Sequence, residues 1–277
     1  MTVTAATPTS RTRPELHQST VAQTLALSKR SILSLWRQPS LVVPSLIFPL
    51  FFAALGTSSF SRATTAVPGF PAVDSYLDFA LAGSVVPGIL FGSTVGATAL
   101  AVDIENGFFD RLLSSPSTRS GIIIGRMAGG MVYGCFQTVF FIVVLLPFGL
   151  SIKGGVAGVL TMAVGGTILA LAVGALMSAM AIKTGSSEAV QGAFPLLFIA
   201  MFFSSAFFPK ETMSGLYKTL AYVNPISYLV EGFRDLTIDG FSASAVVRAV
   251  VIPAILSLFA VGLALWALTS RLGARGQ

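Results

Sequence analysis

Long apolar runs alternate with short polar segments along this chain. Six runs lack Asp, Glu, Lys and Arg altogether, and each is more than twenty residues long. Because a helix rises 1.5 Å per residue, each run can cross a hydrocarbon core about 30 Å thick. The pattern predicts an all-α integral membrane protein, since lipid-exposed backbone must satisfy its own hydrogen bonds. The six expected transmembrane helices are 40–60, 79–102, 122–150, 155–182, 188–208 and 248–270.

The segment before the first span is polar. Residues 1–18 are rich in Thr, Ser and Pro and predict a disordered tail, and 19–277 is expected to form one transmembrane domain. A cleaved signal peptide is disfavoured, because the first long apolar run begins near Leu41 and is longer than a signal-peptide core.

Composition supports the membrane interpretation. Of 277 residues, 54% are hydrophobic and 10% charged, whereas soluble domains carry about 25% charged residues. The net charge of +6 does not indicate nucleic-acid binding, because the basic residues flank apolar runs. With one cysteine, Cys135, and one histidine, His17, the chain offers no disulfide within itself, and no metal site is expected.

The distribution of charge predicts the orientation. If the N-terminus is cytoplasmic, the inner segments hold eleven basic and five acidic residues, and the outer segments hold six of each. By the positive-inside rule, both termini are expected in the cytoplasm. The segment between the second and third spans is then cytoplasmic.

Charge-free spans limit the possible functions. An ion-coupled carrier usually keeps ionisable groups at membrane depth, and the six runs contain none. A membrane enzyme acting on lipids would need the outer Glu231, Asp235 and Asp239 to be catalytic. The chain has no G-x-x-x-x-G-K-[ST] phosphate loop and is not expected to hydrolyse ATP. An ion-coupled carrier and a lipid-modifying enzyme remain the alternatives to transport driven by the ATP hydrolysis of a partner.

The stretch "DIENGFFDRLLSSPSTRSG", which begins at Asp103, interrupts two apolar runs. As a helix from Asp103 to Leu113 it has one apolar face and would lie across the membrane surface. Pro116 would end it. Glu105 projects into the apolar face, either snorkelling at the lipid boundary or contacting a docking protein.

This stretch resembles a family signature. "DIENGFFDRLLSSPSTRSGIIIGR" is similar to the E-x-G-…-L-x-x-[ST]-P-x-[ST]-R-…-G-[KR] pattern of permease subunits of type-2 ABC exporters, most of all the bacterial daunorubicin-resistance type. The resemblance implies a coupling helix moved by a separate ATPase. The pair Phe108-Phe109 departs from it, being bulkier than the Thr often found after the glycine. The implied coupling residues are Asp103, Glu105, Gly107, Phe108, Arg111, Leu112, Pro116 and Arg119.

Two further segments resemble the same family. Residues 21–36 resemble its interfacial elbow helix, anchored by Lys29, Arg30 and Trp36, although an ordinary amphipathic lead-in has the same pattern. The stretch 207–234 resembles its outer re-entrant hairpin, a helix pair with a break at Asn224-Pro225. The expected hairpin residues are Pro209, Asn224, Pro225, Tyr228, Glu231 and Arg234, with Glu231 and Arg234 placed to form an ion pair rather than to contact substrate.

Glycines predict how the spans pack. Gly88, Gly92 and Gly96 recur every four residues on one face, which favours close helix packing within the chain over a dimer seam.

Together these features predict the permease subunit of an ATP-driven exporter in the bacterial inner membrane. The expected partners are cytoplasmic ABC ATPase subunits, which bind the ATP and Mg²⁺, and a second permease copy or paralogue. The chain itself is expected to bind no cofactor. The cargo would be an amphipathic drug, metabolite or lipid. Glu105→Arg is expected to weaken ATPase association without unfolding the permease.

Overall fold

The computed structural model describes residues 20–37, 39–60, 70–71, 73–114 and 119–275. Within these ranges the chain is built from helices and turns and has no β-strand, so the all-α prediction is confirmed. The helices are α1 (Thr20–Trp36), α2 (Pro39–Phe60), α4 (Tyr76–Glu105), α5 (Phe108–Leu113), α6 (Arg119–Leu145), α7 (Gly155–Thr184), α8 (Ser187–Phe202), α9 (Gly215–Val223), α10 (Pro225–Arg234), α11 (Ala243–Val246) and α12 (Ile252–Arg275). Shorter helical turns are η1 (Leu146–Phe148), η2 (Lys210–Thr212), η3 (Asp235–Asp239) and η4 (Val247–Val251).

Five helical segments of the described chain are long and apolar enough to cross a membrane, which makes this a multi-pass membrane protein. They are Val42–Ser59, Tyr76–Glu105, Gly121–Phe148, Gly155–Thr184 and Ala243–Gly273. The expected span 188–208 is not confirmed, because α8 has 16 residues and ends at Phe202. At 1.5 Å per residue it is about 24 Å long.

Serines after α8 explain why the helix ends early. The backbone amide of Ser205 donates to the hydroxyl of Ser227 on α10, at 3.1 Å, and the amide of Ala206 donates to Ser204 Oγ, at 3.2 Å. These side chains supply the bonds that a continuing helix would have made with its own carbonyls. The helix is therefore shorter than the apolar run from which it forms.

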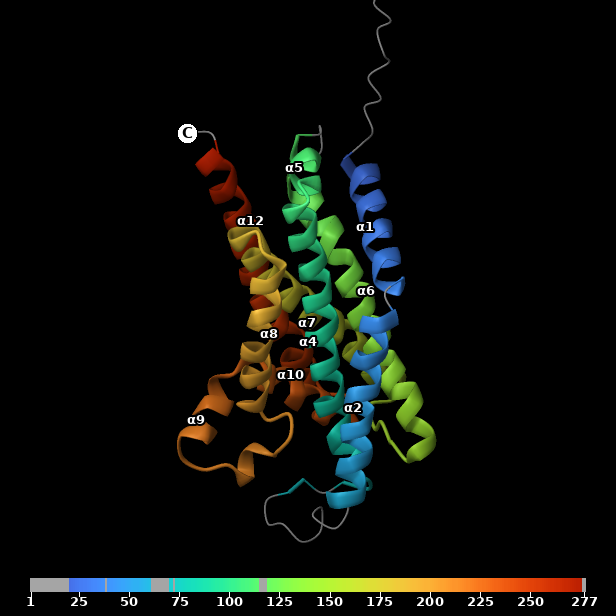
Figure 1. Ribbon diagram of the computed structural model, residues 1–277. Helices are drawn as coiled ribbons and strands as arrows, with labels where there is room; N and C mark the ends of the chain where they lie inside the picture. Colours follow the sequence, from blue (N-terminus) through green and yellow to red (C-terminus); the bar gives the residue numbers. More distant parts are fainter. Residues whose placement is uncertain (1–19, 38, 61–69, 72, 115–118, 276–277) are drawn as a thin grey trace, which may run out of the picture.

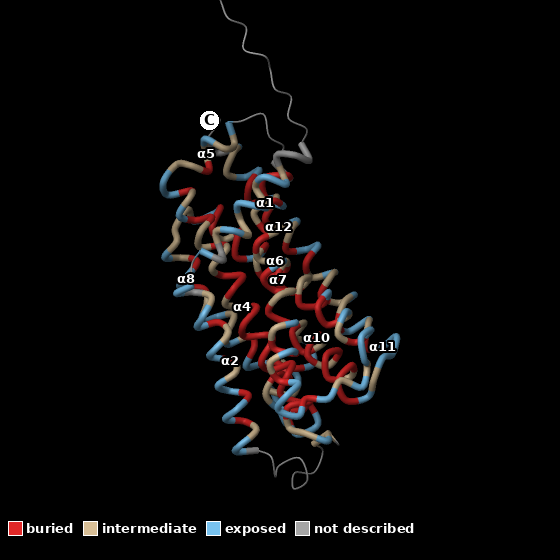
Figure 2. Tube along the Cα trace, turned by 90° about the vertical axis from the view of Figure 1, so that its right-hand side faces the viewer, coloured by how far each residue is buried: buried red, intermediate tan, exposed pale blue. Residues whose placement is uncertain are grey.

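The helices form an elongated bundle with two distinct ends (Figure 1). The start of α1, the short helix α5 and the end of α12 lie at one end, called here the α5 end. Helices α9 and α10 lie toward the other, called here the α9 end. Burial is concentrated in the interior, along much of α4, while α2 and α8 carry many exposed positions (Figure 2).

The central helix α4 begins with a strong cap. Ser75 accepts a hydrogen bond from the amide of Leu77, and Asp78 accepts one from the amide of Ser75. The other carboxylate oxygen of Asp78 accepts from the amide of Ser151, at 2.7 Å. One buried acid therefore both starts α4 and holds the segment before α7.

Glycines on α4 and α6 lie where helices approach closely. A Cβ at Gly88 would meet Gln137, and one at Gly92 would meet the ring of Tyr133. On α6, Gly125 lies against Leu27 and Gly129 against Ser31, so α1 runs along the first turns of α6 in the same direction. Gly96 differs, because a Cβ there would have no neighbour within 4 Å.

Candidate functional site

The corner between α4 and α5 lies at the α5 end. The expected continuous helix 103–113 is wrong, because α4 ends at Glu105 and α5 begins at Phe108. Gly107 between them has φ +69°, a left-handed conformation that glycine adopts without strain. The helix-stopping pair Asn106-Gly107 therefore overrides the amphipathic pattern.

Helix α5 is anchored by its apolar side. Phe109 is fully buried, and Leu112 packs partly buried against the core. Arg111 is exposed on the other side, with its Nε 3.5 Å from the carbonyl of Gly107. Pro116 and the side chain of Arg119 lie outside the described residues.

Glu105 has its partner inside the chain. Its carboxylate accepts a hydrogen bond from the backbone amide of Ser187, at 2.6 Å, and one from the Ser187 hydroxyl, at 3.2 Å. Ser187 is the first residue of α8, so a negative charge sits at a helix N-terminus, where free amides and the helix dipole stabilise it. Glu105 therefore has a partner within the chain, while its side chain stays exposed, and the docking contact expected from the sequence stays a prediction.

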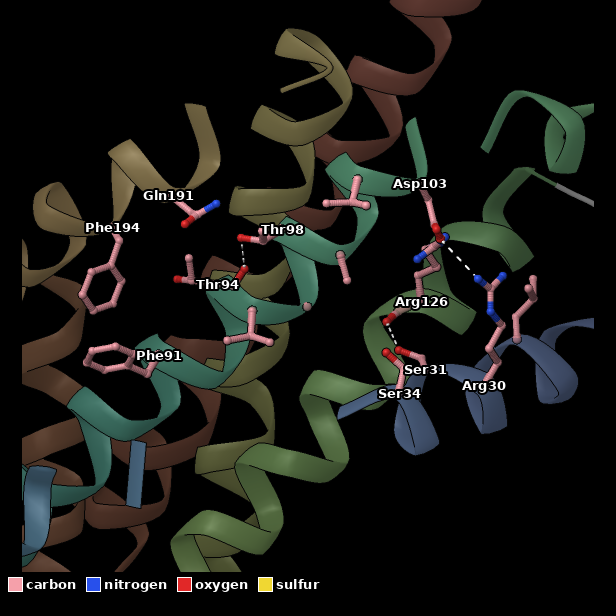
Figure 3. A pocket seen from close by; sticks show the side chains of 15 residues that line it. Arg30, Ser31, Ser34, Phe91, Thr94, Thr98, Asp103, Arg126, Gln191 and Phe194 are labelled. Atoms are coloured by element: carbon pink, nitrogen blue, oxygen red, sulfur yellow. Dashed lines mark hydrogen bonds and ion pairs between the residues drawn. The ribbon is translucent and has the colours of Figure 1, made fainter. Parts of the chain in front are cut away.

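Asp103, two residues before Glu105, binds side chains of α1 and α6. Its carboxylate pairs with Arg126 on α6 and lies 3.6 Å from Arg30 on α1. The guanidinium of Arg30 also stacks over the ring of Phe108, 4.2 Å from its centroid, which ties α1 to α5. Ser31 donates to the carbonyl of Arg126, at 2.7 Å. We name Arg30, Asp103 and Arg126 the charged cluster (Figure 3).

A cavity of about 630 Å³ opens beside the charged cluster. Arg30 and Arg126 lie at one end, and the rings of Phe91 and Phe194 face each other at the other end (Figure 3). Gly96, which has no neighbour for a Cβ, lines the cavity between them. The glycine spacing therefore places two residues in helix contacts and the third on open space.

The structure places the predicted elbow residues in different surroundings. Lys29 is exposed, whereas Arg30 belongs to the charged cluster. The side chain of Trp36 lies outside the described residues. Helix α1 contacts α6 through Leu27 and Ser31, so this helix is packed against the bundle along part of its length.

The hairpin residues gather at the α9 end. Asn224 separates α9 from α10: its Oδ1 accepts from the amide of Ile226, at 2.9 Å, and its Nδ2 donates to the carbonyl of Ala200. Pro225 is the first residue of α10, a position that suits proline. Pro209 is buried at the start of η2.

Two buried cations lie in this hairpin. Arg234 is 4% exposed, lies 3.4 Å from Glu231, donates to the carbonyl of Ala206 at 2.9 Å and stacks over Phe79. Burial lowers the pKa of Arg234 to about 10, so it stays charged at neutral pH. Burial also lowers the pKa of Lys210, whose ammonium lies between the rings of Tyr222 and Tyr228, 5.2 and 5.0 Å from their centroids.

Sequence reasoning missed three residues of these sites. Arg126 fills the last position of the G-[KR] signature at the start of a span, but the sequence indicates no partner for it. Ser187 lies in "GSSEA", a helix-start pattern that could have indicated an N-terminus able to receive a carboxylate. The sequence around Lys210 does not indicate that it is buried, because the rings that contact it, Tyr222 and Tyr228, lie twelve or more residues away.

Comparisons with known proteins match most of the chain. The sequence model of the ABC-2 type transporter family matches residues 22–238. The chain is 26% identical over 219 residues to the daunorubicin resistance ABC transporter permease protein DrrB1 of Streptomyces coeruleorubidus, covering 78% of this chain and 75% of that protein. It is 26% identical over 211 residues to the inner membrane transport permease YadH of Escherichia coli K12, covering 72% and 75%.

Proposed function

Because the chain belongs to the ABC-2 type transporter family and is the membrane permease subunit of an ABC exporter, we propose that a separate ATPase drives it through the α4–α5 corner. The partner binds ATP and Mg²⁺, docks on the exposed side of α5 around Arg111, and pushes this helix when it closes. Arg111 is suited to docking because its side chain points away from the core that holds Phe109.

The observation that carries this proposal is the pair of acids at the corner. Asp103 is bound to α1 and α6, and Glu105 is bound to the first turn of α8. A displacement of α5 therefore pulls on three helices through charge-assisted bonds rather than on α4 alone. The tight turn at Gly107 joins α5 directly to the end of α4 that carries both acids, so a push on α5 reaches them.

The placement in the membrane follows the family resemblance and the charge distribution. The α5 end faces the cytoplasm of a bacterial cell, together with both termini, and α1 serves as an interfacial elbow. Helix α8 acts as a sixth, short span, and α9–α10 form a re-entrant hairpin on the outer side. A second copy or paralogue completes the pathway, and amphipathic cargo moves outward between the two permeases.

Reconstitution tests the proposal. Vesicles containing the chain with its ATPase should move an amphipathic solute only when ATP is present, and vesicles containing the chain alone should move none. Accumulation by the chain alone, driven by an ion gradient, would instead establish an ion-coupled carrier.

The docking surface needs its own test. Arg111→Glu should reduce copurification of the ATPase, because it reverses an exposed charge on α5. Arg248→Glu, beside Asp235 at the end of α10, is the control and should leave copurification unchanged. Equal recovery of the ATPase with both variants would place the docking surface elsewhere.

A further inference from the structure

The cavity beside the charged cluster has an unbalanced charge. Arg30 and Arg126 line it with two guanidinium groups, and Asp103 supplies one carboxylate, so the cluster retains one positive charge. The Nε of Arg126 is buried and has no hydrogen-bond acceptor within the described part of the chain. Buried donors are almost always paired, so an unpaired one beside a cavity indicates a missing acceptor.

The opposite end of the same cavity is apolar. Phe91 and Phe194 face each other there, with ring centroids 4.4 Å apart, and Val95 and Ala99 line the wall on α4. Phe91 and Asp103 are twelve residues apart on α4, so the cavity extends about 18 Å along the helix axis. Its polar end lies where the apolar run of α4 stops, and its apolar end lies about three helical turns further inside that run.

We infer that this cavity binds an amphipathic anion, with a carboxylate or phosphate group between Arg30 and Arg126 and an apolar body extending toward Phe91 and Phe194. Guanidinium groups suit both acids because they donate two parallel hydrogen bonds to them. A volume of about 630 Å³ lies in the range of sites that hold drug-sized ligands. The anion would accept the bond that Arg126 Nε lacks and neutralise the charge left over by Asp103.

This inference rests on the proposed function and deepens it, because it assigns a negative charge to the amphipathic molecule that the permease binds. The acid group has two sources, a cargo molecule with one acid group or the headgroup of an anionic phospholipid. Both place the acid at the boundary of the hydrocarbon core, which is where basic pockets between transmembrane helices bind anionic lipids.

Binding of a fluorescent fatty acid and of its uncharged methyl ester tests the inference. The full chain with its ATPase is placed in phosphatidylcholine nanodiscs, and both probes are titrated. We expect the acid to bind about tenfold more tightly than the ester. Arg30→Gln should remove this preference by removing the surplus charge. Equal affinity of the wild-type complex for acid and ester would overturn the inference.

Gly96 provides a blocking variant. Gly96→Leu should abolish binding of both probes, because Gly96 lines the cavity and a Cβ there has no protein atom within 4 Å. Gly262→Leu is the matched control, since Gly262 also has no neighbour within 4 Å but lies on α12, away from the cavity. Full binding by Gly96→Leu, or equal losses in both variants, would show that the probes bind elsewhere.

Further measurements distinguish a cargo molecule from a lipid headgroup, and failure of this inference from failure of the proposed function. In the nanodiscs, replacing phosphatidylcholine with phosphatidylglycerol displaces the acid if a lipid headgroup occupies the site. In reconstituted vesicles, ATP-dependent movement of the undisplaced acid identifies a cargo. If the ATPase does not copurify with the wild-type chain, the proposed function fails. A copurified, ATP-driven complex that does not distinguish acid from ester removes only the present inference.

Discussion

The charged groups at the two ends of the bundle are held in different ways. At the α9 end Arg234 is 4% exposed and donates to the carbonyl of Ala206, a backbone group that cannot move without its helix or turn. At the α5 end the side chain of Arg30 is 50% exposed and reaches Asp103, another side chain, on a different helix. Side chains can exchange partners during a movement, whereas a buried backbone contact holds one geometry. Arg234 therefore holds its part of the α9 end in one geometry, whereas the half-exposed Arg30 can change partners at the α5 end.

The largest expected effect comes from a substitution that removes a buried cation at the α9 end. Arg234→Met leaves the carbonyl of Ala206 and the carboxylate of Glu231 without their donor, and should lower the free energy of unfolding by about 3–5 kcal/mol. Thermal unfolding of the purified chain in detergent measures the loss. Arg248→Met removes a half-exposed pair with Asp235 and should cost under about 1 kcal/mol. Similar losses in both variants would contradict the single geometry assigned to Arg234.

A second variant breaks the α5 end. Glu105→Arg removes the carboxylate from the first turn of α8 and places a positive charge at a helix N-terminus, so transport should fall about tenfold or more while the ATPase still copurifies. The structure thus shifts the expected defect from docking to transmission. Glu188→Arg, an exposed acid in the same turn of α8, is the control. Loss of copurification only in Glu105→Arg would return this acid to the docking surface.

A third pair of variants compares two positions on α4. Gly92→Ala places a methyl group against the ring of Tyr133 and should cost about 1–3 kcal/mol of stability. Gly96→Ala points into the cavity and should be neutral or slightly stabilising, because alanine favours helix. The order of the two unfolding temperatures checks the difference, and equal values would mean that α4 shifts to relieve the contact.

The smallest expected effect concerns pH at the α9 end. Burial lowers the pKa of Lys210, so below that pKa the folded protein carries a protonation cost that vanishes as the pH rises past the ordinary lysine value. Lys210→Met removes this cost. Its stabilisation relative to the wild type should be greatest at pH 7 and should shrink as the pH approaches 10. A difference that grows with pH would contradict the lowered pKa.

Local patterns predicted much of the fold. The runs that became α2, α4, α6 and α7 were placed within a few residues, because absence of charge over more than twenty residues leaves a membrane helix as the stable arrangement. The break at Asn224 was also predicted, since proline at 225 begins a new helix. The end of α8 was not, because it depends on a hydrogen bond between Ser205 and Ser227, which are distant in sequence.

The candidate site divides in the same way. The sequence by itself determined that acids and an arginine interrupt two apolar runs, that Glu105 needs a partner, and that six long runs contain no Asp, Glu, Lys or Arg. Only the tertiary structure decided that this partner is Ser187, that Asp103 joins Arg30 to Arg126, and that Gly96 faces a cavity. Composition and periodicity act over a few turns of one helix, whereas the partners of a charge are set by which helices pack together.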